Sequence, residues 1–368
     1  SISNNVNGLK IILKTKLNRS VFLVNHTVKQ SMKFIPVKKF GKSLLRIVFL
    51  LTVILGGATL CYLLWNPGSD DPLPDYSDNA IWIGHGWLGD NAWFERKQID
   101  PADFRSEANI AALFRRLADN KISIVYPHLC PARPDGLIAR CDHAQTERFL
   151  DFAEQFGIRV IPWIGGVFGT SACPADVEWR KHFVDSVSDL MNTHPRLAGV
   201  QINIEPMPDG NADFLTLLDE LRATIPGKIL SVAAYPPPTT WHRFPDVHWS
   251  LEYLCKVANR CDQMAVMMYD TSIQLEKVYI DLTTRWTAQL TETLRSIDCD
   301  LLLGIPAYED ADVGYHHPRV ENIISALRGV SAADPGQDIR GIAVYCEWEM
   351  NETKWREWRR MIPGCIND

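Results

Sequence analysis

Residues 197–206 read LAGVQINIEP, a stretch that combines a buried-strand pattern with a row of polar side chains. Successive side chains of a β-strand point to opposite faces. Three aliphatic residues therefore share one face and three polar residues share the other, namely Val200, Ile202, Ile204 and Gln201, Asn203, Glu205. Burying an unsatisfied amide or carboxyl group costs several kcal/mol. The polar face therefore belongs either to an internal hydrogen-bond network or to a functional site, and Glu205, last in the row, is the candidate for function.

This stretch is one of eight similar runs that alternate with segments of helical periodicity. The strand candidates are residues 80–85, 122–127, 159–164, 199–204, 229–234, 263–268, 301–306 and 341–346. The helix candidates are residues 107–119, 143–156, 176–193, 211–223, 249–259, 281–297, 318–329 and 351–361. Eight strands, each followed by a helix, predict an α/β fold, a (β/α)8 TIM barrel over residues 79–365. An open doubly wound sheet is the alternative, but no glycine-rich phosphate loop follows the first strand.

Polar and aromatic residues gather where these strands end, which is where a barrel of this kind forms its active site. An aromatic face covers the apolar face of a pyranose while polar neighbours bind its hydroxyl groups. The pattern therefore predicts a carbohydrate cleft. The expected substrate contacts are Gln201, His85, Tyr126, Trp163, Tyr235, Tyr308, Tyr345, Glu347 and Trp348.

An apolar segment precedes the barrel pattern. Residues 47–65 carry no charge, and 19 residues are long enough to cross a hydrocarbon core of about 30 Å as a helix. Basic residues precede this segment and acidic residues follow it, so the barrel should lie outside the cytoplasm, in the periplasm or the extracellular space. We therefore expect a basic cytoplasmic segment over 1–43, a single-pass transmembrane helix or signal anchor over 44–65 and a linker over 66–78. A cleaved signal peptide and a buried core helix are the alternatives.

Charge and cysteine content narrow the choice of partners. Residues 1–68 hold ten of the 38 basic residues and none of the 44 acidic ones, which leaves residues 69–368 with 28 basic and 44 acidic residues and a net charge of −16. A region with this much negative charge repels phosphate backbones, so nucleic acid is not an expected partner. Eight of the nine cysteines follow the apolar segment, an even number compatible with disulfides, and Cys130–Cys141 and Cys255–Cys261 are close enough in sequence to join local loops. No pair has zinc-ligand spacing, so we predict neither a metal nor a cofactor.

Several segments resemble glycoside hydrolase family 18, the chitinases and endo-β-N-acetylglucosaminidases. The family's fourth strand carries DGxDxDxE, and AGVQINIE at 198–205 keeps its glycine and its final glutamate but replaces its three aspartates. The family's MxYD is similar to residues 267–270, which read MMYD. WIGG at 163–166 and LLGIPAY at 302–308 are similar to its third and seventh strands, in the same order.

The resemblance implies a substrate-assisted retaining reaction on β-linked N-acetylhexosamine glycans, in which the substrate's own acetamido oxygen attacks the anomeric carbon. Glu205 would be the general acid and base, and Asn203 would replace the aspartate that orients the acetamide, with weaker electrostatic stabilisation. Family 85 enzymes are similar in placing an asparagine two residues before their catalytic glutamate. By the same correspondence Tyr269 would hydrogen-bond the acetamide oxygen, Asp270 would bind near the cleaved sugar, and Trp348 or Tyr345 would form the floor beneath it.

Two other functions fit the same residues. The replaced aspartates are compatible with a barrel that binds an oligosaccharide or polysaccharide but does not cleave it. The sequence NIEP at 203–206 also resembles the Asn-Glu-Pro of two-carboxylate retaining glycosidases, with Glu347 or Glu349 as the nucleophile.

Overall fold

The computed structural model describes residues 37–89, 91–129, 131–138, 141–240, 247–310 and 314–366, without the side chains of residues 37–43 and 103. The chain divides into two compact units, Ser1–Leu63 and Leu64–Asp368. Most of the basic segment expected over 1–43 lies outside the described residues.

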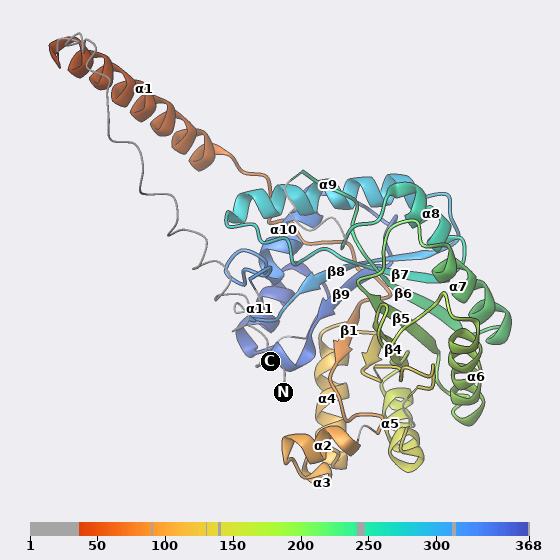
Figure 1. Cartoon of the computed structure of the whole chain (residues 1–368). Helices are drawn as coiled ribbons and strands as arrows, with labels where there is room; N and C mark the ends of the chain where they lie inside the picture. The colour runs from red at the N-terminus through yellow and green to blue at the C-terminus, as the bar shows by residue number, and fades with distance from the viewer. Residues whose placement is uncertain are drawn as a thin grey trace, which may run out of the picture. The chain divides into compact units, whose positions relative to one another are not determined.

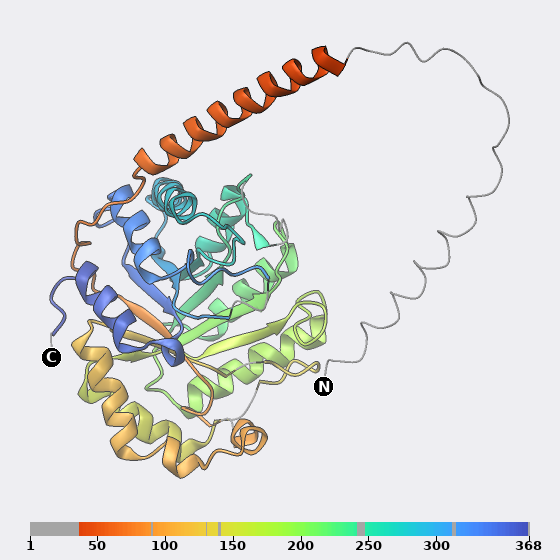
Figure 2. The ribbon, with the colours of Figure 1, turned by 90° about the vertical axis from the view of Figure 1, so that its left-hand side faces the viewer.

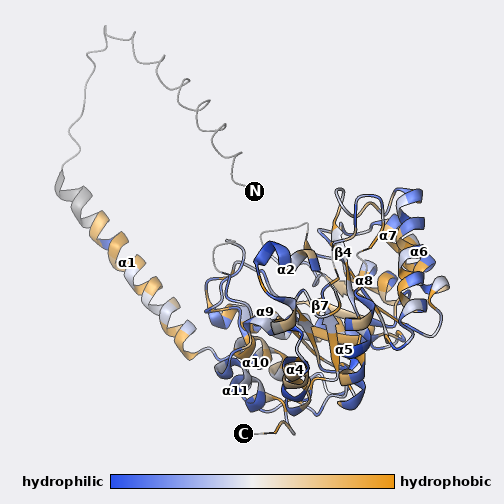
Figure 3. Ribbon diagram, turned by 90° about the horizontal axis from the view of Figure 1, so that it is seen from below, coloured by the Kyte–Doolittle hydropathy of each residue, from blue (hydrophilic) through white to orange (hydrophobic). Residues whose placement is uncertain are grey.

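The first unit contains one described helix, α1 (Val37–Leu64). Residues Leu44–Leu64 of this helix have a mean hydropathy of 2.4 and are not buried by the protein, so by length and composition they could cross a membrane. Figure 3 shows the hydrophobic colour along most of this stretch. This stretch shows none of the burial typical of a core helix, and the domain boundaries remain predictions.

The second unit is built around a parallel sheet whose strands follow the predicted runs closely. They are β1 (Ala80–Ile83), β2 (Ile124–Pro127), β3 (Arg159–Val160), β4 (Trp163–Val167), β5 (Gly199–Glu205), β6 (Ile229–Ala234), β7 (Gln263–Met267), β8 (Asp300–Pro306) and β9 (Gly341–Tyr345). Their order in the sheet is β3-β2-β1-β9-β8-β7-β6-β5-β4. The two ends of this order are consecutive in the chain, so the sheet curls into a TIM barrel and the predicted fold is confirmed (Figure 1).

The third predicted strand appears as two pieces because Ile161 and Pro162 interrupt it. Proline has no N–H group to donate to a neighbouring strand. The first piece pairs with β2 and the second with β5, which places Gly165 opposite Asn203. A Cβ atom at Gly165 would lie 1.5 Å from the backbone oxygen of Asn203, so only glycine permits this close approach.

Helices surround the strands, as Figure 2 shows from the side. They are α2 (Asn91–Lys97), α3 (Pro101–Phe104), α4 (Glu107–Asp119), α5 (His143–Gln155), α6 (Val177–Thr193), α7 (Ala212–Thr224), α8 (Leu251–Ala258), α9 (Glu276–Leu294), α10 (Ile323–Ala333) and α11 (Glu352–Met361), with a short 3-10 helix η3 (Glu347–Glu349). Two predicted boundaries were displaced. The helix expected over 281–297 begins earlier, and the one expected over 318–329 begins later because the Asn322 side chain caps it by accepting a hydrogen bond from Ser325 N.

Residues 66–78, expected to form a linker, have no helix or strand but lie against the barrel. Ser69 N donates to Arg328 O at 3.0 Å and Leu73 N donates to Met361 O at 2.8 Å, and the Leu73 side chain is buried. The segment is therefore held along α10 and α11 by backbone hydrogen bonds and apolar burial.

The described cysteines form no disulfide. Cys255 is not joined to Cys261, and Cys261 Sγ instead lies 3.8 Å from Cys299 Sγ, too far for an S–S bond. Cys130 lies outside the described residues, so its expected pairing with Cys141 is not described either. The pairing of neighbours in sequence fails for Cys255 because the barrel brings the loop before β7 beside the loop before β8.

Candidate functional site at the carboxyl ends of the strands

A cavity of about 380 Å³ opens at the carboxyl ends of the barrel strands. Its walls come mainly from the ends of β1, β4, β5, β7, β8 and β9 and the loops that follow them. The lining residues are Trp82, Trp163, Asn203, Glu205, Met267, Tyr269, Asp270, Tyr308, Asp310, Tyr315, Tyr345, Cys346, Trp348 and Glu349. The structure therefore brings together the four residues expected to be catalytic and four of those expected to contact substrate.

Glu205 lies at the end of β5 and is held by two hydrogen bonds. Asn203 Nδ2 donates to Glu205 Oε1 at 2.8 Å, and Tyr235 Oη donates to Glu205 Oε2 at 3.2 Å. Asn203 reaches the same carboxyl group because residues two apart on a strand point the same way. Tyr235 follows the neighbouring strand β6, so two adjacent strand ends fix the position of this carboxyl group.

The surroundings of Glu205 favour its protonated form. Glu205 is exposed at the mouth of the cavity, and partial desolvation of its carboxyl group there is the main cause of its raised pKa. The hydrogen bonds from Asn203 and Tyr235 lower the pKa and the charge of Asp270 raises it again. A carboxyl group that holds its proton above its ordinary pKa is suited to general acid catalysis.

Two polar atoms at the site have no hydrogen-bond partner among the described residues. Asn203 uses its amide nitrogen on Glu205, which leaves the buried Oδ1 without a donor. The Tyr269 hydroxyl group likewise donates to no described residue, although its ring stacks on Tyr345 with centroids 5.7 Å apart. One free acceptor and one free donor beside Glu205 could bind the N–H and C=O groups of an amide.

Aromatic side chains form the remaining walls. Trp348 is 48% exposed and packs edge-on against Tyr345, with ring centroids 5.7 Å apart. Tyr345 also packs edge-on against Trp163 at 6.1 Å. An exposed indole face at the rim of a polar cavity is the kind of surface on which a sugar ring stacks.

Behind Asp270 lies a second group of charged residues, which we call the mouth cluster: Asp270, His316 and Glu321. His316 Nδ1 is 3.4 Å from Asp270 Oδ1 and 3.7 Å from Glu321 Oε2. The side chains of His316 and Glu321 are both fully buried. Asp270 itself has a left-handed backbone conformation with φ of 64°, which aspartate tolerates better than most residues.

The mouth cluster favours the protonated form of His316. Burial alone lowers the pKa of His316, but the nearby carboxylates of Asp270 and Glu321 outweigh it, so the net pKa is raised. Glu321 is held in turn by Thr271, whose N and Oγ1 atoms donate to its Oε1 at 3.2 and 3.0 Å. Tyr308 Oη also donates to Asp270, so that carboxylate is anchored from two sides.

Two expected substrate contacts do not reach the cavity. Gln201 and Tyr126 have no exposed surface and lie in the barrel interior, where Gln201 Oε1 accepts from Trp82 Nε1 at 2.6 Å and Tyr126 Oη donates to Gln263 Oε1 at 2.6 Å. Ser231 joins the two pairs by accepting from Gln201 and donating to Gln263. The structure corrects their assignment: they complete an internal hydrogen-bond network beneath the site.

Two more of these residues lie beside the cavity without lining it. The His85 ring stacks on Trp93 with centroids 5.6 Å apart, and lies 3.7 Å from the ring of His128. Glu347 lies in η3 with a pKa raised by burial, whereas its neighbour Glu349 lines the cavity.

Sequence reasoning missed the mouth cluster except for Asp270. Tyr315, His316 and His317 form an aromatic run after β8 to which no functional role was assigned. Tyr315 lines the cavity, and His316 contacts Asp270. Their position after a barrel strand was the available signal; Glu321 gave none, since it precedes a helix as many surface glutamates do.

Comparison with known proteins adds an independent observation. The sequence model of the family described as Glycosyl hydrolases family 18 matches residues 118–356, more than half of the chain. A search of curated proteins found no match.

Solved structures of similar fold include a chitinase from Bacteroides thetaiotaomicron, with a TM-score of 0.53 and 11% identity over 80% of this chain and 99% of that one. A class V chitinase from Pseudomonas fluorescens Pf-5 has a TM-score of 0.52 and 14% identity over 77% and 99%. The Bacillus cereus spore cortex-lytic enzyme SleL has a TM-score of 0.52 and 9% identity over 78% and 74%. At these identities the likeness establishes the fold alone.

Proposed function

The chain belongs to glycosyl hydrolase family 18, and on that premise we propose that its barrel hydrolyses β-linked N-acetylhexosamine glycans, with Glu205 as general acid and base. The observation that carries the proposal is the carboxyl group of Glu205 in the cavity, held by hydrogen bonds from Asn203 and Tyr235 and with a pKa raised mainly by desolvation. A single such carboxyl group is what a substrate-assisted retaining mechanism requires.

In the first step Glu205 would give its proton to the glycosidic oxygen while the acetamido oxygen attacks the anomeric carbon, which breaks the glycosidic bond and forms an oxazolinium ion. In the second step the Glu205 carboxylate would take a proton from water, whose oxygen attacks the anomeric carbon and reopens the ring. Asn203 Oδ1, which has no donor among the described residues, would accept from the acetamido N–H. Tyr269 Oη would donate to the acetamido oxygen, and Trp348 would stack beneath the sugar ring.

Asn203 is the largest departure from the family's pattern. A neutral amide orients the acetamide but supplies no negative charge to the oxazolinium ion, so the chemical step should be slower than with aspartate. Asp270 offsets part of this loss, because it lines the same cavity and its charge acts on Glu205.

The test is hydrolysis of N-acetylglucosamine oligomers by the full chain in detergent, compared with Glu205→Gln and with Glu349→Gln as a matched control. We expect Glu205→Gln to lose about 10²- to 10⁴-fold in kcat. Glu349→Gln, which alters a carboxyl group of the same cavity without touching Glu205, should keep most of the activity. Full activity of Glu205→Gln would exclude the assignment.

A barrel that binds the glycan without cleaving it is the second candidate. It is favoured by Asn203, which stands where the family has an aspartate. It predicts tight oligosaccharide binding and no new reducing ends from the wild-type protein over long incubation. The two-carboxylate mechanism has less support, because, of its two possible nucleophiles, only Glu349 lines the cavity that holds Glu205. A sugar adduct on Glu347 or Glu349 after treatment with a fluorosugar inactivator would restore it.

We further propose that α1 anchors the chain in a membrane with the barrel outside the cytoplasm, since basic residues precede this helix and acidic residues follow it. An external protease added to spheroplasts, from which any outer membrane has been removed, should then digest the barrel. Digestion only after the spheroplasts are lysed would place the barrel in the cytoplasm.

A further inference from the structure

A second cavity lies outside the mouth, lined by the loop before α5, the first residue of α5 and the C-terminal half of α6. It has a volume of about 630 Å³, and its lining includes Cys141, His143, Asp189 and His194. His143 and Glu147 are four residues apart on α5 and share one face of that helix, and His194 follows the last residue of α6. We call His143, Glu147 and His194 the outer-wall cluster.

The three side chains of the outer-wall cluster lie close together. One nitrogen of each imidazole and one carboxylate oxygen all lie within 4.8 Å of one another. The His143 and His194 rings face each other with centroids 5.0 Å apart and planes inclined by 34°. His194 is almost entirely buried, with 3% of its side chain exposed, whereas His143 is open to solvent.

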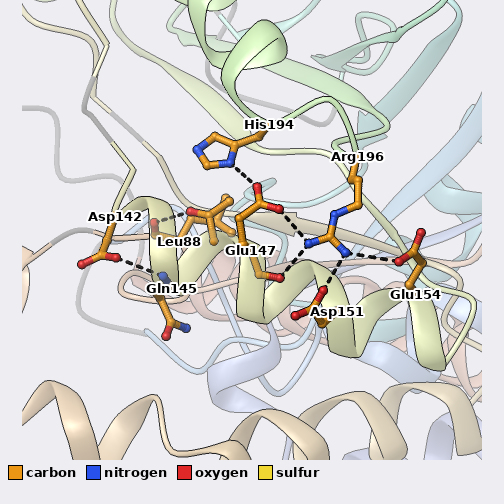
Figure 4. Close-up of polar contacts among 9 residues, drawn as sticks. Leu88, Asp142, Gln145, Glu147, Asp151, Glu154, His194 and Arg196 are labelled. Atoms are coloured by element: carbon orange, nitrogen blue, oxygen red, sulfur yellow. Dashed lines mark hydrogen bonds and ion pairs between the residues drawn. The ribbon is translucent and has the colours of Figure 1, made fainter.

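Glu147 fixes the tautomer of His194. Its Oε1 lies 2.7 Å from His194 Nδ1, and a carboxylate can only accept there, so Nδ1 carries the hydrogen and the lone pair of the neutral ring is on Nε2 (Figure 4). His194 Nε2 and both ring nitrogens of His143 make no hydrogen bond to any described residue. A histidine that donates one N–H to a carboxylate and offers its other nitrogen is the usual arrangement of a metal ligand.

The charges around the outer-wall cluster favour a cation. Arg196 binds Glu147 at 2.7 Å, Asp151 at 2.7 Å and Glu154 at 3.2 Å, so one guanidinium group faces three carboxylates, as Figure 4 shows. The cavity wall also holds the carboxylate of Asp189 and the guanidinium group of Arg133, which is paired with Asp135 at 2.7 Å. The excess negative charge beside two free imidazole nitrogens would be reduced by a bound divalent ion.

From this geometry we propose that the outer-wall cluster binds a divalent transition-metal ion through the imidazoles of His143 and His194, with Glu147 orienting His194. Imidazole ligands select zinc and its neighbours over magnesium and calcium, which take oxygen ligands. The ion would join α5 to the end of α6 and leave its remaining coordination positions to water or to ligands in the cavity. The site is separate from the Glu205 cavity, so the proposal does not depend on the proposed reaction.

The test is zinc binding by the full chain in detergent, with a reductant that does not chelate metals. Isothermal titration calorimetry measures the affinity, and the change in Tm on adding zinc measures the stabilisation. The wild-type protein should bind one zinc ion per chain, and His143→Ala should lower the affinity for zinc at least tenfold. Zinc should raise the Tm of the wild type but not that of His143→Ala. Glu147→Gln should weaken zinc binding by about 10- to 100-fold, the usual effect of removing a partner that orients a metal ligand.

His182→Ala is the matched control, because His182 is an exposed histidine of α6 whose Nδ1 is bonded to Asp135 O, outside the outer-wall cluster. It should bind zinc like the wild type. Because His143 is exposed, His143→Ala should fold normally, which its Tm without zinc checks. The proposal is overturned if the wild type binds no zinc, or if His143→Ala binds zinc as tightly as His182→Ala does.

Discussion

The mouth cluster and the outer-wall cluster both place a buried histidine beside a glutamate, yet they differ in how many carboxylates face the ring. In the mouth cluster the fully buried side chain of His316 lies between the carboxylates of Asp270 and Glu321. In the outer-wall cluster His194 faces the single carboxylate of Glu147, which Arg196 already neutralises in part. Two carboxylates stabilise a proton on a histidine, whereas one leaves a lone pair for another ligand.

The consequences differ because burial differs. Glu321 is fully buried, so its charge depends on His316 for compensation. Glu147 is about one third exposed, so water and Arg196 can replace any one partner. A histidine beside a glutamate is therefore a structural ion pair in the mouth cluster and an adaptable surface group in the outer-wall cluster.

Removing the histidine of the mouth cluster should have the largest effect. His316→Ala leaves Glu321 without its cation in a fully buried position, and breaking a buried pair in this way costs about 3–5 kcal/mol of unfolding free energy. Urea denaturation measures this loss of unfolding free energy. His143→Ala, at an exposed position of the outer-wall cluster, should stay within about 0.5 kcal/mol of the wild type without added metal. Equal losses in both variants would contradict the comparison.

The two clusters should also respond to pH in opposite directions. The folded protein raises the pKa of His316 above 6.5, so its stabilisation is complete below pH 6.5 and is lost as pH rises through the raised pKa. The difference in unfolding free energy between the wild type and His316→Gln, measured as a function of pH, should fall over that range. A difference that stays constant up to pH 9 would mean that His316 is not held as a cation.

Removing the carboxylate of the outer-wall cluster should have the smallest effect. Bonds from His194 and Arg196 lower the Glu147 pKa below 4.5, so its contribution is present above pH 4.5 and is lost as pH falls through the lowered pKa. Solvent screens this partly exposed group, so Glu147→Gln should cost less than about 1 kcal/mol at pH 7 in metal-free buffer. Urea denaturation at pH 7 and pH 3 should show that small difference only at the higher pH.

Local pattern was enough to predict the barrel. The alternation of short aliphatic runs with helical segments fixes the order of strands, because each strand must bury both faces between the barrel interior and a helix. The common direction of Asn203 and Glu205 follows from the two-residue period of a strand, and the observed hydrogen bond between them agrees with it.

Depth along the barrel axis could not be predicted in the same way. Gln201 and Asn203 share a face and nearly the same chemistry, but Gln201 lies within the interior network and Asn203 lines the cavity. The period of a strand gives the direction of a side chain. How far up the barrel it lies depends on the large side chains of other strands that fill the space, such as Trp82 and Tyr126.

The sequence by itself determined the fold, the apolar helix and Glu205 as the central acid, because each depends on the spacing of residues within one segment. Only the tertiary structure brought Tyr235 to Glu205, His316 and Glu321 to Asp270, and His194 to Glu147. These partners are separated by 30 to 51 positions along the chain, and their meeting depends on which strand ends and helices the closed barrel makes neighbours. Separations of that length leave no periodic signal, so contact between such residues is decided by packing alone.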